Sequence, residues 1–146
     1  MTEVVRILVV DDDSTISQLI SEILSLDGFK DVQWASNGIE AVNQYQELMP
    51  DLVLMDISMP VMDGYEASCR IKSMDPEAKI VVLTGNPGDS RARRILSEGI
   101  AETVITKPIR LQKLLDIVRS KAAGTPAPDA PPPVFSMPQG SPPLTA

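Results

Sequence analysis

Short apolar runs alternate with amphipathic segments along most of the chain. Each run has the length and aliphatic character of a buried strand, and the segment after it carries apolar residues at helical spacing. The strands are predicted over 5–10, 32–35, 51–55, 79–83 and 103–106. The helices are predicted between Asp13-Ser14 and Asp27-Gly28, and then over 38–48, about 64–74, about 89–98 and 110–121.

The apolar residues of the helices mark the faces that we expect to be buried. Recurrence every three or four residues places such side chains on one face of a helix. The expected inward residues are Ile16, Leu19, Ile20, Ile23 and Leu24 in the first helix, Ile39, Val42, Tyr45 and Leu48 in the second, and Leu111, Leu114, Leu115 and Val118 in the last.

Five strand–helix units in succession predict an α/β fold with a five-stranded parallel sheet. Right-handed crossovers carry each helix over one face of such a sheet. The flavodoxin-like strand order 2-1-3-4-5 is one of the two common doubly wound solutions. It places the strands over 5–10 and 51–55 side by side, at the switch point where ligands bind.

The composition changes near Ala122. Residues 122–146 contain eight of the 13 prolines and one charged residue, Asp129. Such a segment cannot bury enough apolar surface to fold, so we expect one domain over 1–121 and a disordered tail over 122–146. Within the tail, Val134-Phe135 is a candidate docking motif, although such a pair more often has no role.

The overall charge narrows the range of partners. The chain carries a net charge of −7, has no histidine and has one cysteine. This balance argues against a nucleic-acid surface, which needs clustered Lys and Arg. No run approaches the ~20 apolar residues of a membrane helix. We therefore expect a soluble cytoplasmic protein without a membrane or nucleic-acid partner.

Polar residues gather where the predicted strands end. Asp11 and Asp12 follow the first strand, Asp56 follows the third, Thr84 follows the fourth and Lys107 follows the fifth. Because parallel strands end at the same edge of a sheet, these side chains should converge there.

An all-oxygen cluster of this kind has a defined chemistry. Three neighbouring carboxylates do not all stay ionised without a cation, and oxygen ligands favour a hard ion such as Mg²⁺. A nearby lysine can hold a second anion, and a hydroxyl can bind a phosphoryl oxygen. These are the parts of a phosphoryl-transfer site, in which an aspartate can itself be the nucleophile.

Other polar residues have simpler interpretations. Asp13 is expected to be a helix cap, and Asp63 before Gly64 a turn residue and helix cap. The arginines of the helix over 89–98 form either a solvated face or part of a site for an acidic partner; these are Arg91, Arg93 and Arg94.

Four segments in order carry a family resemblance over about residues 4–121. They are ILVVDDD at 7–13, DLVLMDISMPVMDG at 51–64, VVLTGN at 81–86 and ITKP at 105–108. With these segments, the chain closely resembles the CheY-like receiver domains of bacterial two-component response regulators.

The resemblance implies a role for each residue of the cluster. Asp56 would be the phosphoacceptor, and Asp11, Asp12 and Asp56 would hold Mg²⁺ together with the backbone carbonyl of Ser58. Thr84 would be the switch hydroxyl, and Lys107 would contact the phosphoryl group. A domain of this kind assists its own phosphorylation and dephosphorylation but is not an enzyme that acts on an external substrate.

The resemblance also implies partners. A histidine kinase or a histidine phosphotransfer protein would donate the phosphoryl group. The signal would leave through a conformational shift of the face over 89–121, where a downstream protein could bind. We expect a stand-alone receiver, with a receiver cut within a linker to a further domain as the alternative.

Two positions depart from the family pattern. Val104 stands where the family usually has Tyr or Phe, and Gly85 follows Thr84 where Ala is usual. We therefore expect a smaller or differently transmitted conformational change. The resemblance also implies that Ser58 and Asn86 would lie beside the incoming water and would influence the lifetime of the phosphoryl group.

Two alternatives remain open at this point. The segment Asp11–Thr15 also fits the D-x-D-x-T pattern of haloacid-dehalogenase-type phosphatases, with Asp11 as nucleophile and Asp13 as acid/base. That interpretation leaves Asp56 unexplained and has no later acidic motif after Lys107. The other alternative is a pseudo-receiver that binds partners without phosphorylation.

Overall fold

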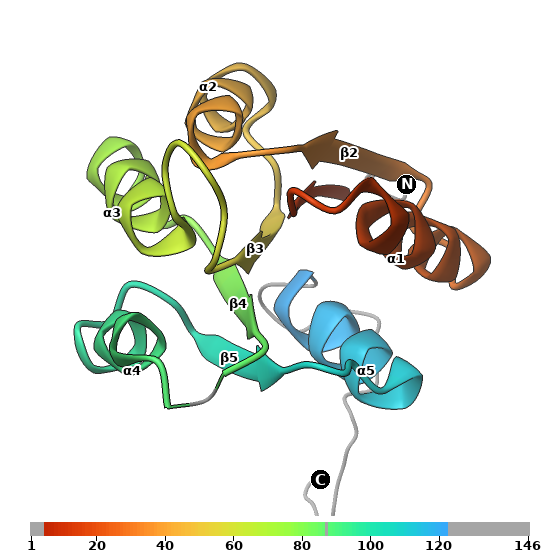
Figure 1. Ribbon diagram of the computed structural model, residues 1–146. Coiled ribbons are helices and arrows are strands. Elements are labelled where there is room, and N and C mark those ends of the chain that lie inside the picture. The colour runs from red at the N-terminus through yellow and green to blue at the C-terminus, as the bar shows by residue number, and fades with distance from the viewer. Residues whose placement is uncertain (1–4, 87, 123–146) are drawn as a thin grey trace, which may run out of the picture.

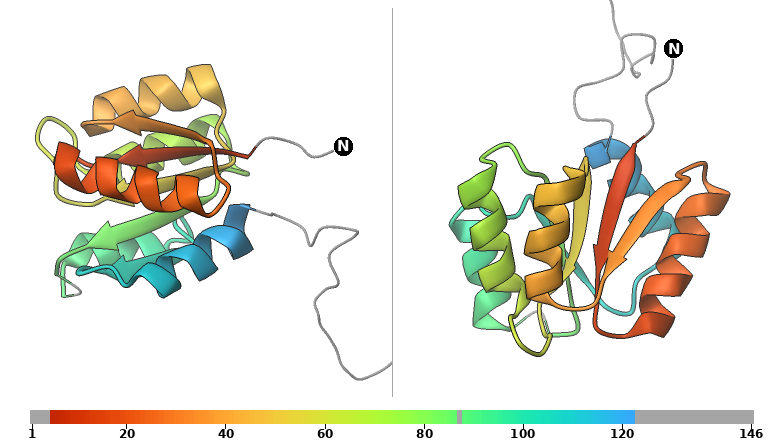
Figure 2. Two further views of the ribbon diagram at one scale, coloured as in Figure 1. Left: turned by 90° about the vertical axis from the view of Figure 1, so that its right-hand side faces the viewer. Right: turned by 90° about the horizontal axis from the view of Figure 1, so that it is seen from above.

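The computed structural model describes residues 5–86 and 88–122 of the chain. Its five strands form one parallel sheet in the order β2-β1-β3-β4-β5, with helices on both faces (Figures 1 and 2). The predicted doubly wound α/β fold is confirmed. The elements are β1 Arg6–Val10, α1 Ser14–Leu26, β2 Asp31–Ala35, α2 Gly38–Leu48, β3 Leu52–Asp56, α3 Gly64–Met74, β4 Ile80–Thr84, α4 Ser90–Ser97, β5 Thr103–Thr106 and α5 Leu111–Ala122.

The sheet separates two aliphatic cores. Helices α1 and α5 cover one face, and α2, α3 and α4 cover the other (Figure 1). Because side chains alternate along a strand, Val53 and Met55 of β3 face the second group of helices, whereas Leu52 and Leu54 face the first. Both sides of β3 and β4 are buried, which explains why their sequences read as continuous apolar runs.

Side-chain caps fix where four of the helices begin. The carboxylates of Asp13, Asp63 and Asp89 and the amide oxygen of Asn37 accept backbone N–H groups at the first turns of α1, α3, α4 and α2. Such caps satisfy donors that have no partner within the helix. The predictions for Asp13 and Asp63 as caps are confirmed.

Three of the expected inward residues are largely exposed. Leu19, Ile39 and Leu111 keep 52%, 44% and 53% of their surface. The buried stripe of α2 runs through Gly38, Ala41 and Tyr45, and Ile39 lies beside it. In α2 the prediction was wrong because the small residues Gly38 and Ala41 face the sheet and let the helix approach it closely, which leaves Ile39 beside the contact.

Leu19 and Leu111 border an apolar groove between α1 and α5. The groove has a volume of about 270 Å³. Its other lining residues are Ile16, Ile20, Ile23, Lys107, Pro108, Ile109 and Leu114.

Two further expectations concern membranes and the tail. None of the described helices is both long and apolar enough to cross a bilayer. The predicted tail, including Val134-Phe135, lies outside the described residues apart from Ala122, the last residue of α5. The division into a domain over 1–121 and a tail over 122–146 therefore stays a prediction.

A close backbone approach shapes the turn after β3. The N–H of Gly64 donates to the carbonyl of Ile57 at 2.8 Å, which folds the start of α3 back onto the end of β3. A Cβ atom at Gly64 would lie 2.1 Å from the carbonyl oxygen of Asp56, a distance that backbone atoms cannot accommodate without a shift. This position requires glycine, and it fixes the loop that leads away from Asp56.

Gly64→Ala is therefore expected to lower the free energy of unfolding by about 3 kcal/mol, because the backbone must move to relieve the clash. Urea denaturation of the full chain measures this. Gly85→Ala is the matched control, because no atom lies within 4 Å of its added Cβ; its cost should stay within about 0.5 kcal/mol. Equal costs for the two variants would contradict the argument.

Candidate functional site

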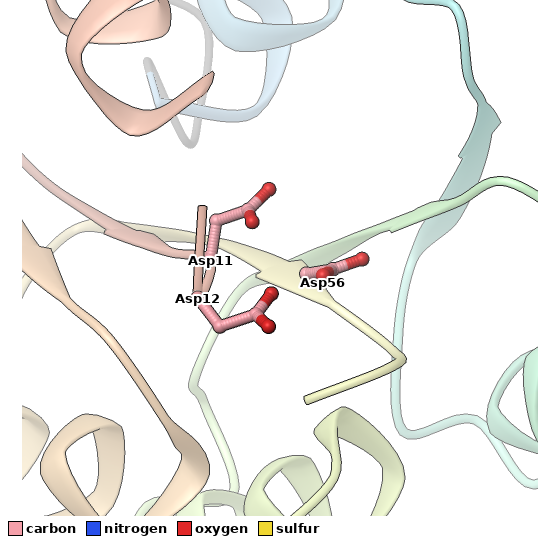
Figure 3. Close-up of side chains that lie close together, drawn as sticks. All are labelled: Asp11, Asp12 and Asp56. Atoms are coloured by element: carbon pink, nitrogen blue, oxygen red, sulfur yellow. The ribbon is translucent and has the colours of Figure 1, made fainter. Parts of the chain in front are cut away.

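Three carboxylates lie together at the carboxyl edge of the sheet. The pairing of Val10 with Met55 brings the ends of β1 and β3 side by side. Asp11 and Asp12 follow β1, Asp56 ends β3, and each of the three contributes a carboxylate oxygen within 4.8 Å of the others (Figure 3). The sequence-predicted cluster is thus present at the predicted switch point.

Burial distinguishes the three acids. Asp11 and Asp56 retain 1% and 5% of their surface, whereas Asp12 is exposed. The ammonium group of Lys107 lies 3.3 Å from Asp11 Oδ2 and 3.2 Å from Asp56 Oδ1. One lysine cannot neutralise three carboxylates. An oxygen-only donor set with excess negative charge and one exposed member suits a hard divalent cation that keeps some of its waters.

The local charges shift two pKa values. Burial raises the pKa of Asp56, Lys107 opposes this, and the neighbouring Asp11 adds to the rise. For Lys107, burial alone would lower the pKa, but the carboxylates of Asp56 and Asp11 outweigh it and raise the pKa. Lys107 therefore remains charged, and Asp56 is a carboxylate that a bound cation would stabilise in its ionised form.

Hydrogen bonds hold Asp11 in place. Its Oδ1 accepts the backbone N–H of Asp13 at 2.9 Å, and its carbonyl accepts the indole N–H of Trp34 at 3.0 Å. Its backbone N–H donates to the carbonyl of Ala35 at 3.1 Å. The contribution of Trp34 was not foreseen, because its contact depends on the pairing of β1 with β2.

Thr84 and Lys107 are linked through the backbone. The N–H of Lys107 donates to the carbonyl of Thr84 at 2.7 Å, so the lysine is positioned by the end of β4. The Thr84 hydroxyl donates to the carbonyl of Asn86 and accepts its N–H, both at 3.1 Å. Among the described contacts, none joins this hydroxyl to Asp56. The structure places Thr84 on the adjacent strand but directs its hydroxyl into its own loop.

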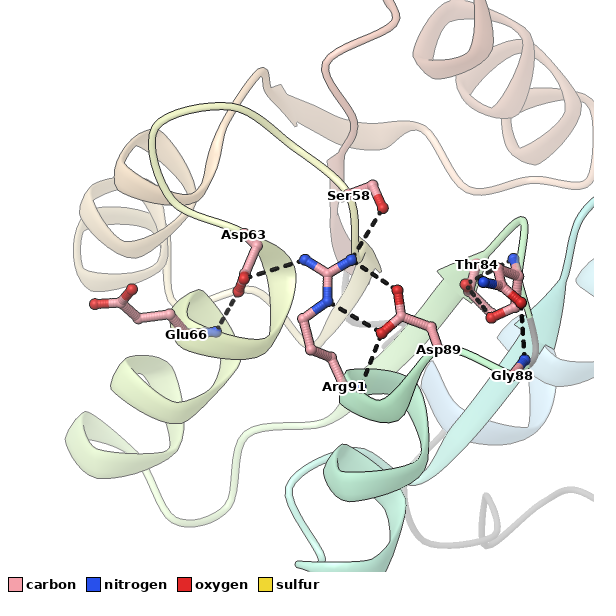
Figure 4. Close-up of polar contacts among 8 residues, drawn as sticks. Ser58, Asp63, Glu66, Thr84, Gly88, Asp89 and Arg91 are labelled. Carbon is pink, nitrogen blue, oxygen red and sulfur yellow. Dashed lines mark hydrogen bonds and ion pairs between the residues drawn. The ribbon is translucent and has the colours of Figure 1, made fainter.

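Ser58 and Asp63 both contact Arg91, and the sequence did not predict these contacts. The Arg91 guanidinium contacts the Ser58 hydroxyl, the Asp63 carboxylate and the Asp89 carboxylate (Figure 4). The expectation of a solvated face therefore does not hold for Arg91. No sequence signal links positions 63 and 91, because their contact depends on the shapes of two loops.

Asp13 is separate from the acidic cluster. It is exposed, and its carboxylate accepts the N–H of Thr15 at 2.9 Å as the cap of α1. Among the described residues, the acidic group with metal-ligand spacing is Asp11, Asp12 and Asp56. This arrangement does not favour the phosphatase alternative, which needs Asp13 beside Asp11 as the acid/base.

Comparison with known proteins agrees with this site. The family model for the response regulator receiver domain matches residues 7–119. The chain belongs to this family. Receiver domains take part in two-component signalling through phosphorylation on an aspartate, and in general they accept the phosphoryl group without being enzymes. The chain is therefore a CheY-like receiver domain of two-component signalling. Neither the phosphatase nor the pseudo-receiver alternative is favoured.

Relatives and solved structures support the assignment. The chemotaxis protein CheY of Bacillus subtilis is 39% identical over 113 residues, which cover 77% of this chain and 93% of that protein. The CheX–CheY–BeF₃–Mg²⁺ complex from Borrelia burgdorferi matches with 30% identity and a TM-score of 0.74, covering 80% of this chain and 87% of that one. A CheY-like receiver domain protein from Methanospirillum hungatei matches with 29% identity and a TM-score of 0.77, covering 82% and 94%.

The raised pKa of Asp56 has a consequence for stability. A carboxyl group whose pKa is higher in the folded chain makes the fold less stable as pH rises from its unfolded value, about 4, through its folded value. The Asp56→Asn variant does not lose stability in this way, because its amide side chain does not ionise. In the absence of divalent cations at pH 7, we expect it to raise the free energy of unfolding.

Urea denaturation in EDTA measures this difference between the receiver domain and its Asp56→Asn variant. The advantage should disappear as pH falls below the unfolded pKa, because the native carboxyl is then protonated as well. Asp12→Asn is the matched control: it removes an exposed acid of the same cluster and should stabilise less. A variant less stable than the original chain at pH 7 would rule out the argument.

Proposed function

We propose that Asp56 of this receiver domain accepts the phosphoryl group. The observation that carries the proposal is the position of its carboxylate, which is almost fully buried at the end of β3 and held 3.2 Å from the ammonium of Lys107. Asp11 and Asp12 crowd it from the neighbouring strand. A carboxylate of this kind is fixed in orientation, and its anionic neighbours favour recruitment of a cation to the same place.

The other two acids suit nucleophilic attack less well. One oxygen of Asp11 accepts the N–H of Asp13, and the other contacts Lys107. Asp12 is exposed, and no contact with Lys107 is described for it. Asp56 keeps one carboxylate oxygen that no described hydrogen bond occupies.

Asp11, Asp12, Asp56 and the carbonyl of Ser58 would hold Mg²⁺. When bound, the ion would neutralise the excess charge of the cluster and of the incoming phosphoryl oxygens. Lys107 would hold a phosphoryl oxygen as a point charge, because its ammonium already lies between Asp56 and Asp11. Thr84 would reach the phosphoryl group only after its hydroxyl leaves Asn86.

The phosphoryl donor would be a phosphohistidine on a kinase or a phosphotransfer protein. An oxygen of Asp56 attacks phosphorus, the P–O bond forms, and the P–N bond to the donor imidazole breaks. The leaving nitrogen keeps the electron pair. Most of the catalysis in such a transfer comes from positioning and charge neutralisation, which are the contributions that the cluster and Lys107 provide.

The output of the domain would be a population shift on the face over 89–121, which a downstream protein reads. Phosphorylation replaces the carboxylate charge of Asp56 by the larger negative charge of the phosphoryl oxygens, next to Lys107 and Thr84. States that move these two groups towards the phosphoryl oxygens therefore gain population. The cytoplasm as the site of action and the stand-alone form of the protein stay predictions.

Incubation with acetyl phosphate and Mg²⁺ is expected to add one phosphoryl group to the full chain, at Asp56. Intact-mass measurement followed by mapping of the acid-labile acyl phosphate tests this. Asp56→Asn should abolish incorporation, whereas Asp51→Asn, at the opposite end of the β3 region, should retain it. Retained labelling in Asp56→Asn would place the nucleophile elsewhere, and phosphomonoester turnover dependent on Asp11 and Asp13 would favour the phosphatase alternative.

Asp12→Asn is expected to weaken Mg²⁺ binding by about tenfold or more, because it removes a ligand from a small oxygen set. Trp34 can report the binding through its fluorescence, since it is the single tryptophan and its indole contacts the carbonyl of Asp11. Asp13→Asn is the matched control; it removes an adjacent acid outside the cluster and should leave the affinity unchanged. An equal loss in both variants would mean that only the net charge matters.

A further inference from the structure

Arg91 connects the two loops that flank Asp56. Its Nη2 lies 2.7 Å from Asp89 Oδ2 and its Nε lies 3.1 Å from Asp89 Oδ1, while its Nη1 lies 3.2 Å from Asp63 Oδ2 (Figure 4). Nη2 also donates to the Ser58 hydroxyl at 3.3 Å. We call these four residues the Arg91 brace.

The brace joins the starting points of two helices. Asp63 caps α3 by accepting the N–H of Glu66 at 2.9 Å, and Asp89 caps α4 by accepting the N–H of Arg91 at 2.8 Å. A planar guanidinium that contacts both capping carboxylates restricts how one helix can move against the other. Ser58 is two residues beyond Asp56, so the same guanidinium also contacts the loop that leaves the phosphorylation site.

Protonation of the carboxylates does not break the ion pairs of the Arg91 brace at physiological pH. Hydrogen bonds from Arg91 lower the pKa of Asp89 to about 2, and the same contact raises the pKa of Arg91. A competing anion can break these ion pairs, because a guanidinium binds phosphoryl oxygens as readily as carboxylates. Phosphorylation of Asp56 would bring such an anion to the neighbouring end of β3.

The usual aromatic switch has no equivalent at position 104. Val104 is partly buried and packs against the core beneath α2, α3 and α4. It has no ring that could move inward when the site is occupied. Val104 therefore cannot connect the site to α4 in the way that an aromatic side chain would.

We propose that the Arg91 brace transmits phosphorylation of Asp56 to helix α4. This inference rests on the proposed function. Arg91 acts here as a positioning residue: movement of the Ser58 loop, or attraction of the guanidinium towards the phosphoryl oxygens, shifts Asp89 and the start of α4 with it.

A second link between α3 and α4 provides an internal comparison. Arg94 lies over the ring of Tyr65, 4.7 Å from its centroid, and its Nη2 donates to the Tyr65 hydroxyl at 2.9 Å. Tyr65 in turn donates to Glu98. This link joins the two helices, but none of its described contacts involves the loops beside Asp56, so breaking it should leave transmission intact.

The experiment uses the ¹⁵N-labelled full chain, with Mg²⁺ and beryllofluoride as a phosphoryl mimic. For each variant, the amide shifts of Ile95, Leu96 and Ser97 are compared with and without beryllofluoride. In Arg91→Gln we expect the shifts caused by beryllofluoride in α4 to fall to less than about half, while those at Ile57 and Thr84 persist. Arg91→Lys keeps the positive charge but lacks the planar guanidinium that contacts several acceptors at once. It should therefore give an intermediate loss of the α4 shifts.

Two variants serve as controls. Arg93→Gln removes an exposed arginine of the same helix, and Arg94→Gln breaks the second link; both should keep the full α4 response. An unchanged α4 response in Arg91→Gln would overturn the proposal, as would an equal loss in Arg94→Gln. If beryllofluoride caused no shifts at Ile57 and Thr84 in the original chain, the proposed function itself would fail, and this inference with it.

Discussion

Repulsion among three carboxylates at the carboxyl edge of β1 and β3 is the constraint on which the site depends. The sheet order forces Asp11, Asp12 and Asp56 together, and Lys107 neutralises only part of their charge. Such a cluster costs free energy in the empty state, and binding of a cation relieves it. The same excess of negative charge that disfavours the empty site favours a divalent ion and, through it, a phosphoryl group.

The surrounding fold moderates this repulsion. Helices α1, α3 and α4 begin at the same edge, each with a capping aspartate: Asp13, Asp63 and Asp89. The amino ends of helices carry partial positive charge, which favours anions at this edge. Arg91 then joins two of the caps, so ion pairs at this edge of the sheet also connect the starts of α3 and α4.

Most of the fold and the core of the site could be predicted because they follow from strand pairing. Periodicity located the strands, and a parallel sheet brings their ends together, so Asp11, Asp12, Asp56 and Lys107 were foreseeable. The Arg91 brace was not, because its contacts depend on loop shape rather than on register. The exposure of Leu19 was missed for a similar reason. The spacing of apolar residues shows which face of a helix is apolar, but the packing of the helix against the sheet decides which residues of that face are buried.

Repulsion among the carboxylates of Asp11, Asp12 and Asp56 destabilises the folded domain, and a bound cation removes this destabilisation. Unfolding of the full chain, followed at increasing Mg²⁺ concentration, tests it most directly. At about 100 times the dissociation constant, the free energy of unfolding should rise by about 2.7 kcal/mol, and Asp12→Asn, with its affinity weakened about tenfold, should rise by only about 1.4 kcal/mol at the same concentration. Unfolding that is identical in Mg²⁺ and in EDTA would contradict the account.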